Sequence, residues 1–126
     1  TVNALSTCIG LSICYDIRFP ELYRELTLQG AQILTVPSAF TIPTGKAHWK
    51  PLLRARAIEN LCWLVAAGQV GDHPGRSTWG HSVIINPWGE VVAEKETGVG
   101  YITAEVDLQK LRDLRASFPC LNHRRL

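Results

Sequence analysis

The sequence predicts an α/β protein with a mixed sheet, and three observations support this fold class. Short runs of apolar residues have the length and period of β-strands and recur along the 126-residue chain. Helical stretches separate the first three runs, and this order predicts parallel pairing of their strands. Two later runs flank the turn Pro87-Trp88-Gly89, which predicts an antiparallel hairpin.

A strand that ends in a cysteine opens the predicted fold. Apolar residues alternate with small or polar ones from about Cys8 to Cys14, which is the period of a strand. Pro20 suits the first turn of a helix, where its missing N–H has no partner to lose. We therefore expect Cys14 at a sharp turn between a strand and a helix, where a thiolate nucleophile is favoured.

The other elements follow in alternating order. Gly30 suits the carboxyl cap of the first helix, Leu53 and Ala57 begin the apolar stripe of the second, and Asp107 is suited to cap a third. The expected elements are the helix Pro20–Gln29, the strand Ile33–Val36, the loop Pro37–Lys46, the helix Pro51–Leu61, the strand Trp63–Gln69, the polar loop Gly71–Gly80, the hairpin strands His81–Asn86 and Glu90–Ala93, the strand Gly100–Val106 and the helix Leu108–Ala116.

Composition is that of an ordinary globular domain. Hydrophobic residues make up 46% and charged residues 19% of the chain. The net charge of +2 is too small to indicate nucleic-acid binding. No run approaches the ~20 apolar residues of a membrane span, and no signal-peptide pattern is visible, so we expect a cytoplasmic protein with no membrane partner. Arg115, Arg124 and Arg125 are expected to be solvated or paired across an interface.

The four cysteines point to free thiols rather than to a disulfide or a metal site. Cys8 and Cys14 would be about 20 Å apart on one strand, which is too far for a disulfide. None of the cysteines stands at metal-ligand spacing from a histidine, so no metal is expected. Cys62 precedes an apolar run and is expected to pack in the core.

Several segments carry a family resemblance. The segment CYDIRFPEL, which begins at Cys14, resembles the nucleophile segment of the nitrilase superfamily, the carbon–nitrogen hydrolases. The match continues in register through GAQILTVPSAFTIPTGKAHW, LLRARAIENLCWLVAAGQVG, GHSVIINPWGEVV and HRR, from about residue 7 to residue 126. It is most similar to the branch that includes ω-amidases and deaminated-glutathione amidases. The resemblance implies the four-layer α-β-β-α sandwich of that superfamily and a homo-oligomer of two or more copies.

One departure from the family pattern concerns the catalytic residues. Members use a glutamate and a lysine, both upstream of the cysteine strand, together with the cysteine. Here the residues that precede Cys14 contain neither Glu nor Lys, and the chain contains no methionine. We therefore expect residues 1–126 to be the carboxyl-terminal portion of a carbon–nitrogen hydrolase domain, without the half that carries the Glu and Lys. This portion alone is expected to be inactive.

The expected reaction is hydrolysis of a small linear amide with release of ammonia. Cys14 is the expected nucleophile and forms a thioester, and the backbone N–H of Tyr15 is expected to stabilise the oxyanion. The resemblance assigns the base and a second oxyanion contact to the upstream Glu and Lys. Thiol, carboxylate and ammonium groups suffice for this chemistry, so no cofactor is implied.

Candidate substrate contacts lie in and around the loop that follows the second strand. Such carboxyl-end loops shape ligand sites in α/β sheets. Arg18 is suited to bind a substrate carboxylate through two hydrogen bonds, or else to pair with Asp16 or Glu21. The loop candidates are Ser38, Phe40, Thr44, His48 and Trp49.

Two other functions stay open at this point. A half-domain could be a non-catalytic module that binds a partner chain to complete its sheets, and it would then form a stable complex without turnover. Cys14 could instead serve a thiol-redox protein, which would require a low thiol pKa and is disfavoured by the lack of a nearby resolving cysteine.

Overall fold

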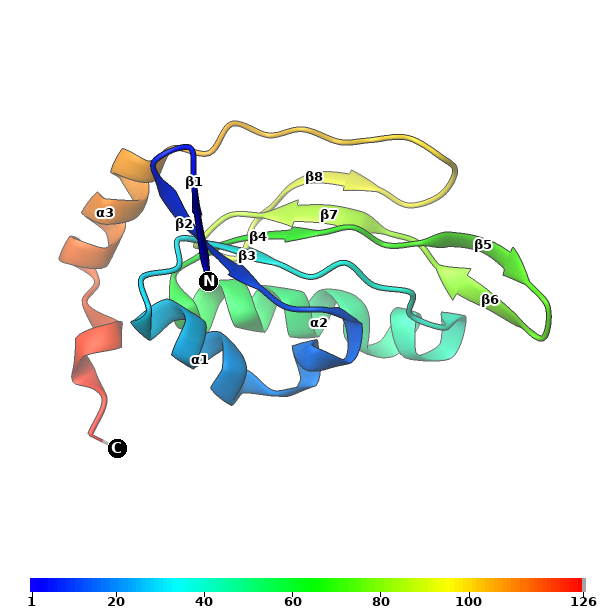
Figure 1. Cartoon of the computed structure of the whole chain (residues 1–126), viewed down its shortest axis with the longest axis horizontal. Coiled ribbons are helices and arrows are strands. Elements are labelled where there is room, and N and C mark those ends of the chain that lie inside the picture. The colour runs from blue at the N-terminus through cyan, green and yellow to red at the C-terminus, as the bar shows by residue number, and fades with distance from the viewer. Residues whose placement is uncertain (126) are drawn as a thin grey trace.

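One twisted six-stranded sheet organises the chain, as the computed structural model of residues 1–125 shows (Figure 1). The strand order is β1-β2-β3-β4-β7-β8, and β5 and β6 form a separate two-stranded ribbon. The strands are β1 (Val2–Ala4), β2 (Thr7–Leu11), β3 (Ile33–Thr35), β4 (Trp63–Ala66), β5 (Val70–His73), β6 (Arg76–Trp79), β7 (Ser82–Ile85) and β8 (Val91–Lys95). The helices are α1 (Pro20–Leu28), α2 (Ile42–Asn60) and α3 (Leu108–Ser117), with 3₁₀ turns η1 (Cys14–Arg18) and η2 (Cys120–His123).

The pairing within the sheet confirms the α/β class with a mixed sheet. β2, β3 and β4 are parallel, with Gly10 opposite Leu34 and Leu34 opposite Leu64. β7 joins β4 antiparallel and forms the predicted hairpin with β8. Of the four layers that the family resemblance implies, this chain therefore contains one helical layer and one sheet.

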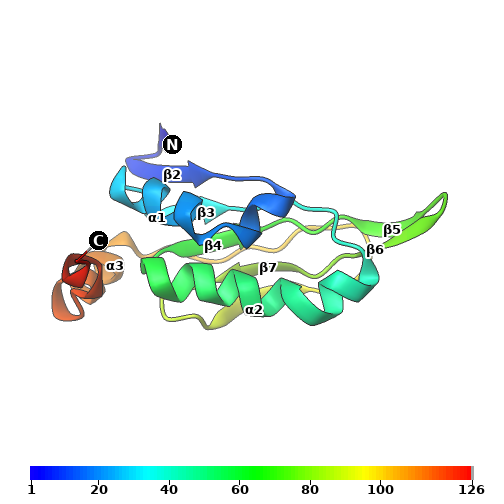
Figure 2. The same cartoon turned by 90° about the horizontal axis from the view of Figure 1, so that it is seen from below.

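The helices α1 and α2 cover one face of the sheet (Figure 2). Their apolar side chains and those of the strands form the larger core, in which Tyr23, Leu34, Trp49 and Leu53 are almost fully buried. Gly10 lets α1 approach β2, because a Cβ there would lie only 3.1 Å from the Cβ of Leu26 on α1. Burial of this apolar surface is the main stabilising contribution at the helix–sheet interface.

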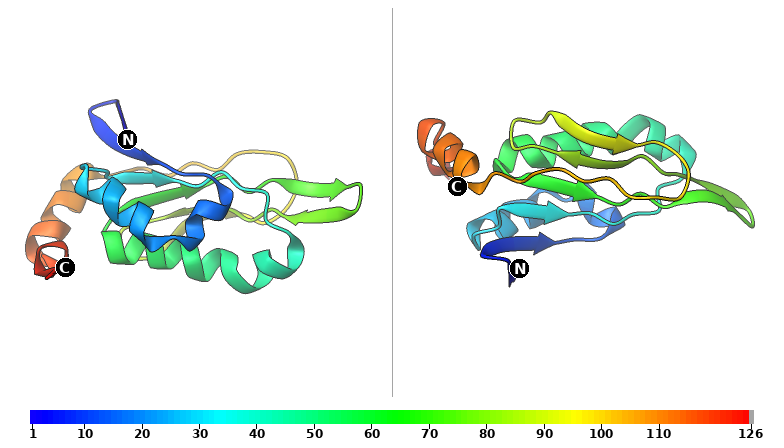
Figure 3. Two further views of the ribbon diagram at one scale, coloured as in Figure 1. Left: turned by 60° about the horizontal axis from the view of Figure 1, so that its bottom comes forward. Right: turned by 90° about the horizontal axis from the view of Figure 1, so that it is seen from above.

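The opposite face of the sheet is covered by the segment that leads from β8 to α3 (Figure 3, right). Its side chains at Ile102, Ala104 and Val106 pack on a smaller cluster around Trp63 and Leu111. The expected strand Gly100–Val106 is wrong, because this segment is extended but joins no ladder. Its alternation of inward and outward side chains has the period of a strand because it lies flat on a sheet face.

Two other boundaries differ from expectation. The predicted loop Pro37–Lys46 contains the start of α2, which begins at Ile42, and Pro51 lies on the exposed side within this helix rather than at its start. Water can bind the carbonyl that Pro51 leaves without a donor at this exposed position. The predicted polar loop Gly71–Gly80 is the β5–β6 hairpin, closed at Gly75 with a φ of +83°.

Arg115 of α3 binds the ends of other elements. Its Nε donates to the Leu61 carbonyl oxygen at 3.0 Å, and its Nη2 donates to the Ala31 carbonyl oxygen at 2.9 Å. Nη2 also lies 3.1 Å from Cys62 Sγ. The expectation that Arg115 is solvated or paired across an interface is therefore wrong. Cys62 is fully buried as expected, and burial raises the pKa of its thiol despite the opposing charge of Arg115.

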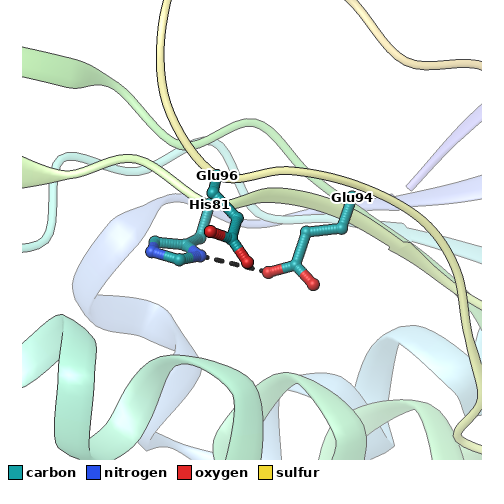
Figure 4. Close-up of side chains that lie close together, drawn as sticks. All are labelled: His81, Glu94 and Glu96. Carbon is teal, nitrogen blue, oxygen red and sulfur yellow. Dashed lines mark hydrogen bonds and ion pairs between the residues drawn. The ribbon is translucent and has the colours of Figure 1, made fainter.

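A group of charged side chains links β8 to α2. Lys50 Nζ lies 2.9 Å from Glu94 Oε2. His81 Nδ1 lies 3.1 Å from Glu94 Oε1 (Figure 4). Burial alone would raise the pKa of Glu94, but the hydrogen bonds from Lys50 and His81 outweigh it and lower that pKa below its usual value. Ionised Glu94 therefore stabilises the packing of α2 on the sheet.

Within residues 1–125, no helix has both the length and the apolar character that a membrane span requires.

Replacing Arg115 should destabilise the fold. In Arg115→Ala the Leu61 and Ala31 carbonyl groups lose their donor in a half-buried site, so we expect a loss of about 1–3 kcal/mol in the free energy of unfolding. Arg112→Ala is the matched control, because within the described part of the chain the Arg112 side chain bonds to Gln109 alone, on the exposed face of the same helix. Urea denaturation of both variants measures the difference, and equal losses would contradict the assignment.

Acidification should weaken the fold through Glu94. The pKa of Glu94 is lowered in the folded state, so its contribution is present above the unfolded value of about 4.3 and is lost as pH falls through the folded value. Below about pH 5 the unfolding free energy of the native sequence should therefore fall more steeply than that of Glu94→Gln. Urea denaturation between pH 3 and pH 7 gives both curves, and parallel curves would rule out this role.

Candidate active site

Cys14 occupies a constrained position just beyond β2. The strand ends at Leu11, and Cys14 begins the 3₁₀ turn η1 with a φ of +48°, a left-handed conformation uncommon for a non-glycine residue. Its N–H donates to the Pro37 carbonyl oxygen at 2.9 Å. The Asp16 carboxylate accepts a 2.8 Å hydrogen bond from the N–H of Ile13 and so holds the turn together. The expected strand-to-helix turn is present, with a 3₁₀ turn inserted before α1.

The segments that leave the three parallel strands run side by side at one edge of the sheet. The Ser38 N–H donates to the Ala67 carbonyl oxygen, and the Gln69 N–H donates back to the Ser38 carbonyl oxygen, each at 2.8 Å. These contacts extend the parallel pairing and bring Cys14 beside them. The result is an open cleft of about 570 Å³ whose lining includes Cys14, Ser38, Gly68, Gln69, Ser82 and Gly100.

Tyr15 is the second residue of η1. The first N–H groups of a helical turn have no partner within the turn, so the Tyr15 N–H is available to an oxyanion formed next to Cys14. Tyr15 is 65% exposed. The guanidinium carbon of Arg18 lies over the Tyr15 ring, 5.2 Å from the ring centroid. The role of the Tyr15 backbone N–H stays a prediction.

Arg18 joins two other predicted residues in a group of its own. Its guanidinium lies 5.5 Å from the centroid of the Phe40 ring, and its Nη1 lies 3.3 Å from His48 Nδ1 on α2. Among the described residues its contacts are therefore with aromatic rings rather than ion pairs with Asp16 or Glu21. The guanidinium keeps donors for a carboxylate, and that use stays a prediction.

The remaining residues predicted to contact the substrate differ in how deeply their side chains are buried. Ser38 lines the cleft with Cys14. Thr44 is half-buried, with its hydroxyl 3.0 Å from that of Thr41 at the start of α2. Phe40 and Trp49 pack against each other in the core, with ring centroids 4.9 Å apart, and Trp49 Nε1 donates to the His81 carbonyl oxygen. Burial of Trp49 to 1% exposure favours packing over direct contact with a substrate.

Gly68, Gln69, Ser82 and Gly100 also line the cleft and were not among the residues predicted from the sequence. Gly68 must be glycine, because a Cβ there would lie 2.0 Å from the Gly80 carbonyl oxygen, and its N–H donates to Ser82 Oγ at 3.0 Å. Gln69 follows a parallel strand, so the carboxyl-end rule that selected Ser38 could also have found it. Ser82 and Gly100 carry no comparable signal, because only the tertiary fold returns them to this edge.

The cluster that His81, Glu94 and Glu96 form has a donor set that can bind a cation. One potential ligand atom from each lies within 4.8 Å of the others (Figure 4). The Lys50 ammonium lies 2.9 Å from Glu94, so this carboxylate already has a positively charged partner. We interpret Glu94, with Lys50 and His81, as an ion-pair group that links β8 to α2.

A second groove, of about 460 Å³, lies at the other end of the sheet. It is lined by Trp63, which begins β4, and by Trp88 and Leu111 among others. Cys14 lies beyond the opposite ends of the parallel strands, so this groove is separate from the cleft. Because Cys14 is the predicted nucleophile, its cleft is the candidate active site.

Known proteins match this chain over most of its length. A family model described as carbon-nitrogen hydrolase matches residues 2–116. The human protein named deaminated glutathione amidase is 54% identical over 118 residues, which cover 93% of this chain and 36% of that protein.

Two solved structures extend the comparison. The NitFhit protein of Caenorhabditis elegans superposes with a TM-score of 0.90 at 53% identity, covering 93% of this chain and 29% of that chain. A mutant amidase from a Nesterenkonia species, described with acrylamide added at its active-site cysteine, superposes with a TM-score of 0.76 at 31% identity, covering 94% of this chain and 46% of that chain. This chain spans less than half the length of each of these relatives. With a family model that covers most of its residues and a relative more than half identical to it, the chain belongs to the carbon–nitrogen hydrolase family.

Proposed function

We propose that the protein containing this chain hydrolyses the C–N bond of a small linear amide, with Cys14 as nucleophile. The observation that carries the proposal is the position of Cys14, held in a left-handed turn at the cleft where three parallel strands end. The names of the relatives support it, since one is an amidase of deaminated glutathione and another has an active-site cysteine that accepts acrylamide.

The first half of the reaction forms a thioester. The Cys14 thiolate attacks the amide carbon, and the carbonyl oxygen becomes an oxyanion that accepts a hydrogen bond from the Tyr15 N–H. The C–N bond then breaks, and the leaving nitrogen takes a proton and departs as ammonia or an amine. The acyl group remains on Cys14 Sγ.

The second half releases the acid. A base removes a proton from water, the hydroxide attacks the thioester carbon, and Cys14 departs as a thiolate. Glutamate and lysine for the base and the second oxyanion contact are not found before Cys14 in this sequence. We propose that both come from parts of the protein outside residues 1–126.

Association with further protein is a second property that we propose for this chain, on the basis of its exposed apolar side chains. Leu5, Val99 and Tyr101 are 98%, 100% and 89% exposed, and β1 and β8 are the outer strands of the sheet. Surfaces of this kind favour contact with further protein, so we propose that the chain is covered in the assembled protein and that the assembly is a homo-oligomer. A purely partner-binding role would give the same surface without turnover.

A thiol-redox role has less support. Cys14 is half-buried, and among the described residues no other cysteine lines its cleft. A disulfide with a second thiol would therefore require a rearrangement of the turn.

Loss of Cys14 should abolish amide hydrolysis by the complete protein. In both Cys14→Ala and Cys14→Ser we expect kcat/KM to fall by at least about a thousandfold, because the thiolate forms the covalent intermediate. Cys120→Ala is the matched control, since Cys120 is half-buried in η2 outside the cleft, and it should stay within about twofold of the native protein. Release of amine or ammonia from deaminated glutathione and from short amides measures the rates.

Mass spectrometry after iodoacetamide labelling provides an independent check. Modification of Cys14 should parallel the loss of activity. Retention of full activity by Cys14→Ala would reject the proposal, and a stable complex with a partner chain in the absence of turnover would favour the binding role.

A further inference from the structure

We infer that Gln69 contacts the substrate in the Cys14 cleft and that His73 positions its side chain, an inference that rests on the proposed amide hydrolysis. Gln69 lines the cleft together with Cys14 and Ser38. The part of the substrate it meets is a hydrogen-bond acceptor, a carbonyl or carboxylate, away from the bond that is cleaved.

The backbone of Gln69 is fixed on both sides. Its N–H donates to the Ser38 carbonyl oxygen at 2.8 Å, and its own carbonyl oxygen accepts from the Gly80 N–H at 3.1 Å. The first contact ties it to the segment after β3, and the second ties it to the returning end of the β5–β6 hairpin. A side chain on such a fixed backbone can hold a repeatable position over the cleft.

The side chain of Gln69 is oriented by His73. Gln69 Nε2 lies 3.2 Å from His73 Nε2. An amide nitrogen has no lone pair to accept a hydrogen bond, so the amide donates and the imidazole nitrogen accepts. This leaves the second amide N–H and the Oε1 of an exposed side chain free for a ligand.

His73 is itself held by the hairpin, which projects beyond the end of β4 (Figure 1). It pairs with Arg76 across the ribbon. The buried Thr78 hydroxyl donates to the Gly71 carbonyl oxygen at 3.1 Å and lies 3.5 Å from His73 Nε2. Trp79 N–H donates to the Phe40 carbonyl oxygen at 2.8 Å, which anchors the base of the hairpin beside α2.

A matched pair of amides tests the contact. Succinamate and butyramide have the same four-carbon chain and the same scissile amide, but only succinamate carries a distal carboxylate, which can accept a hydrogen bond from the Gln69 amide. In Gln69→Ala of the complete protein we expect KM for succinamate to rise by about tenfold to a hundredfold with kcat little changed. The kcat/KM for butyramide should stay within about twofold.

The role of His73 is tested in the same assay. His73→Phe keeps a ring but removes the acceptor, so the preference for succinamate should fall in the same direction by a smaller factor. The double variant should have the same preference for succinamate as Gln69→Ala alone, because His73 acts on the substrate only through Gln69. Asp72→Asn, on the same strand with an exposed side chain, is the control and should keep the native preference.

Binding separates this inference from the proposed reaction. Calorimetry on Cys14→Ala measures the affinity of both amides without turnover, and adding Gln69→Ala should remove the preference for succinamate. An unchanged preference, or equal losses for both amides, would overturn the role of Gln69 even if the protein is an amidase. If the native protein hydrolyses neither amide while this preference is present, the contact stands and the proposed reaction fails for these substrates.

Discussion

The parallel pairing of β2, β3 and β4 is the constraint on which the rest of the structure depends. Because all three strands point the same way, the segments that follow them emerge together at one edge of the sheet. Hydrogen bonds continue the pairing past the strand ends, from Cys14 to Pro37 and from Ser38 to Ala67. Cys14, the proposed nucleophile, therefore lies in a cleft whose walls are positioned by the sheet.

Close contacts at two glycines attach the β5–β6 hairpin to this edge. Gly68 lies against the Gly80 carbonyl oxygen, and Gly45, in the first turns of α2, lies under the Trp79 ring, where a Cβ would be 2.1 Å from the ring. Neither position has room for a side chain, so the hairpin and the start of α2 are packed as one unit beside the cleft. The proposed role of Gln69 and His73 depends on this packing, since it fixes the support from which both residues act.

At the end of the parallel strands opposite Cys14, the elements are held together by side-chain hydrogen bonds. Arg115 donates to carbonyl groups beyond α1 and at the end of α2, where the helix dipole is negative. The guanidinium thereby satisfies acceptors that the helices leave open and draws α3 against the sheet. Cys14 and Arg115 thus lie at opposite ends of the parallel strands and are not in direct contact with each other.

The sequence by itself determined the fold class, most of the elements and the turn that carries Cys14, because strand period, helix caps and turn residues act over a few neighbouring positions. The tertiary structure alone decided that 100–106 is a cover and not a strand, that Arg115 binds carbonyl groups, and that Ser82 and Gly100 share the cleft with Cys14. These outcomes depend on contacts between residues far apart in the chain. Local periodicity describes which side of an element is apolar, but it contains no information on which distant segment will cover that side.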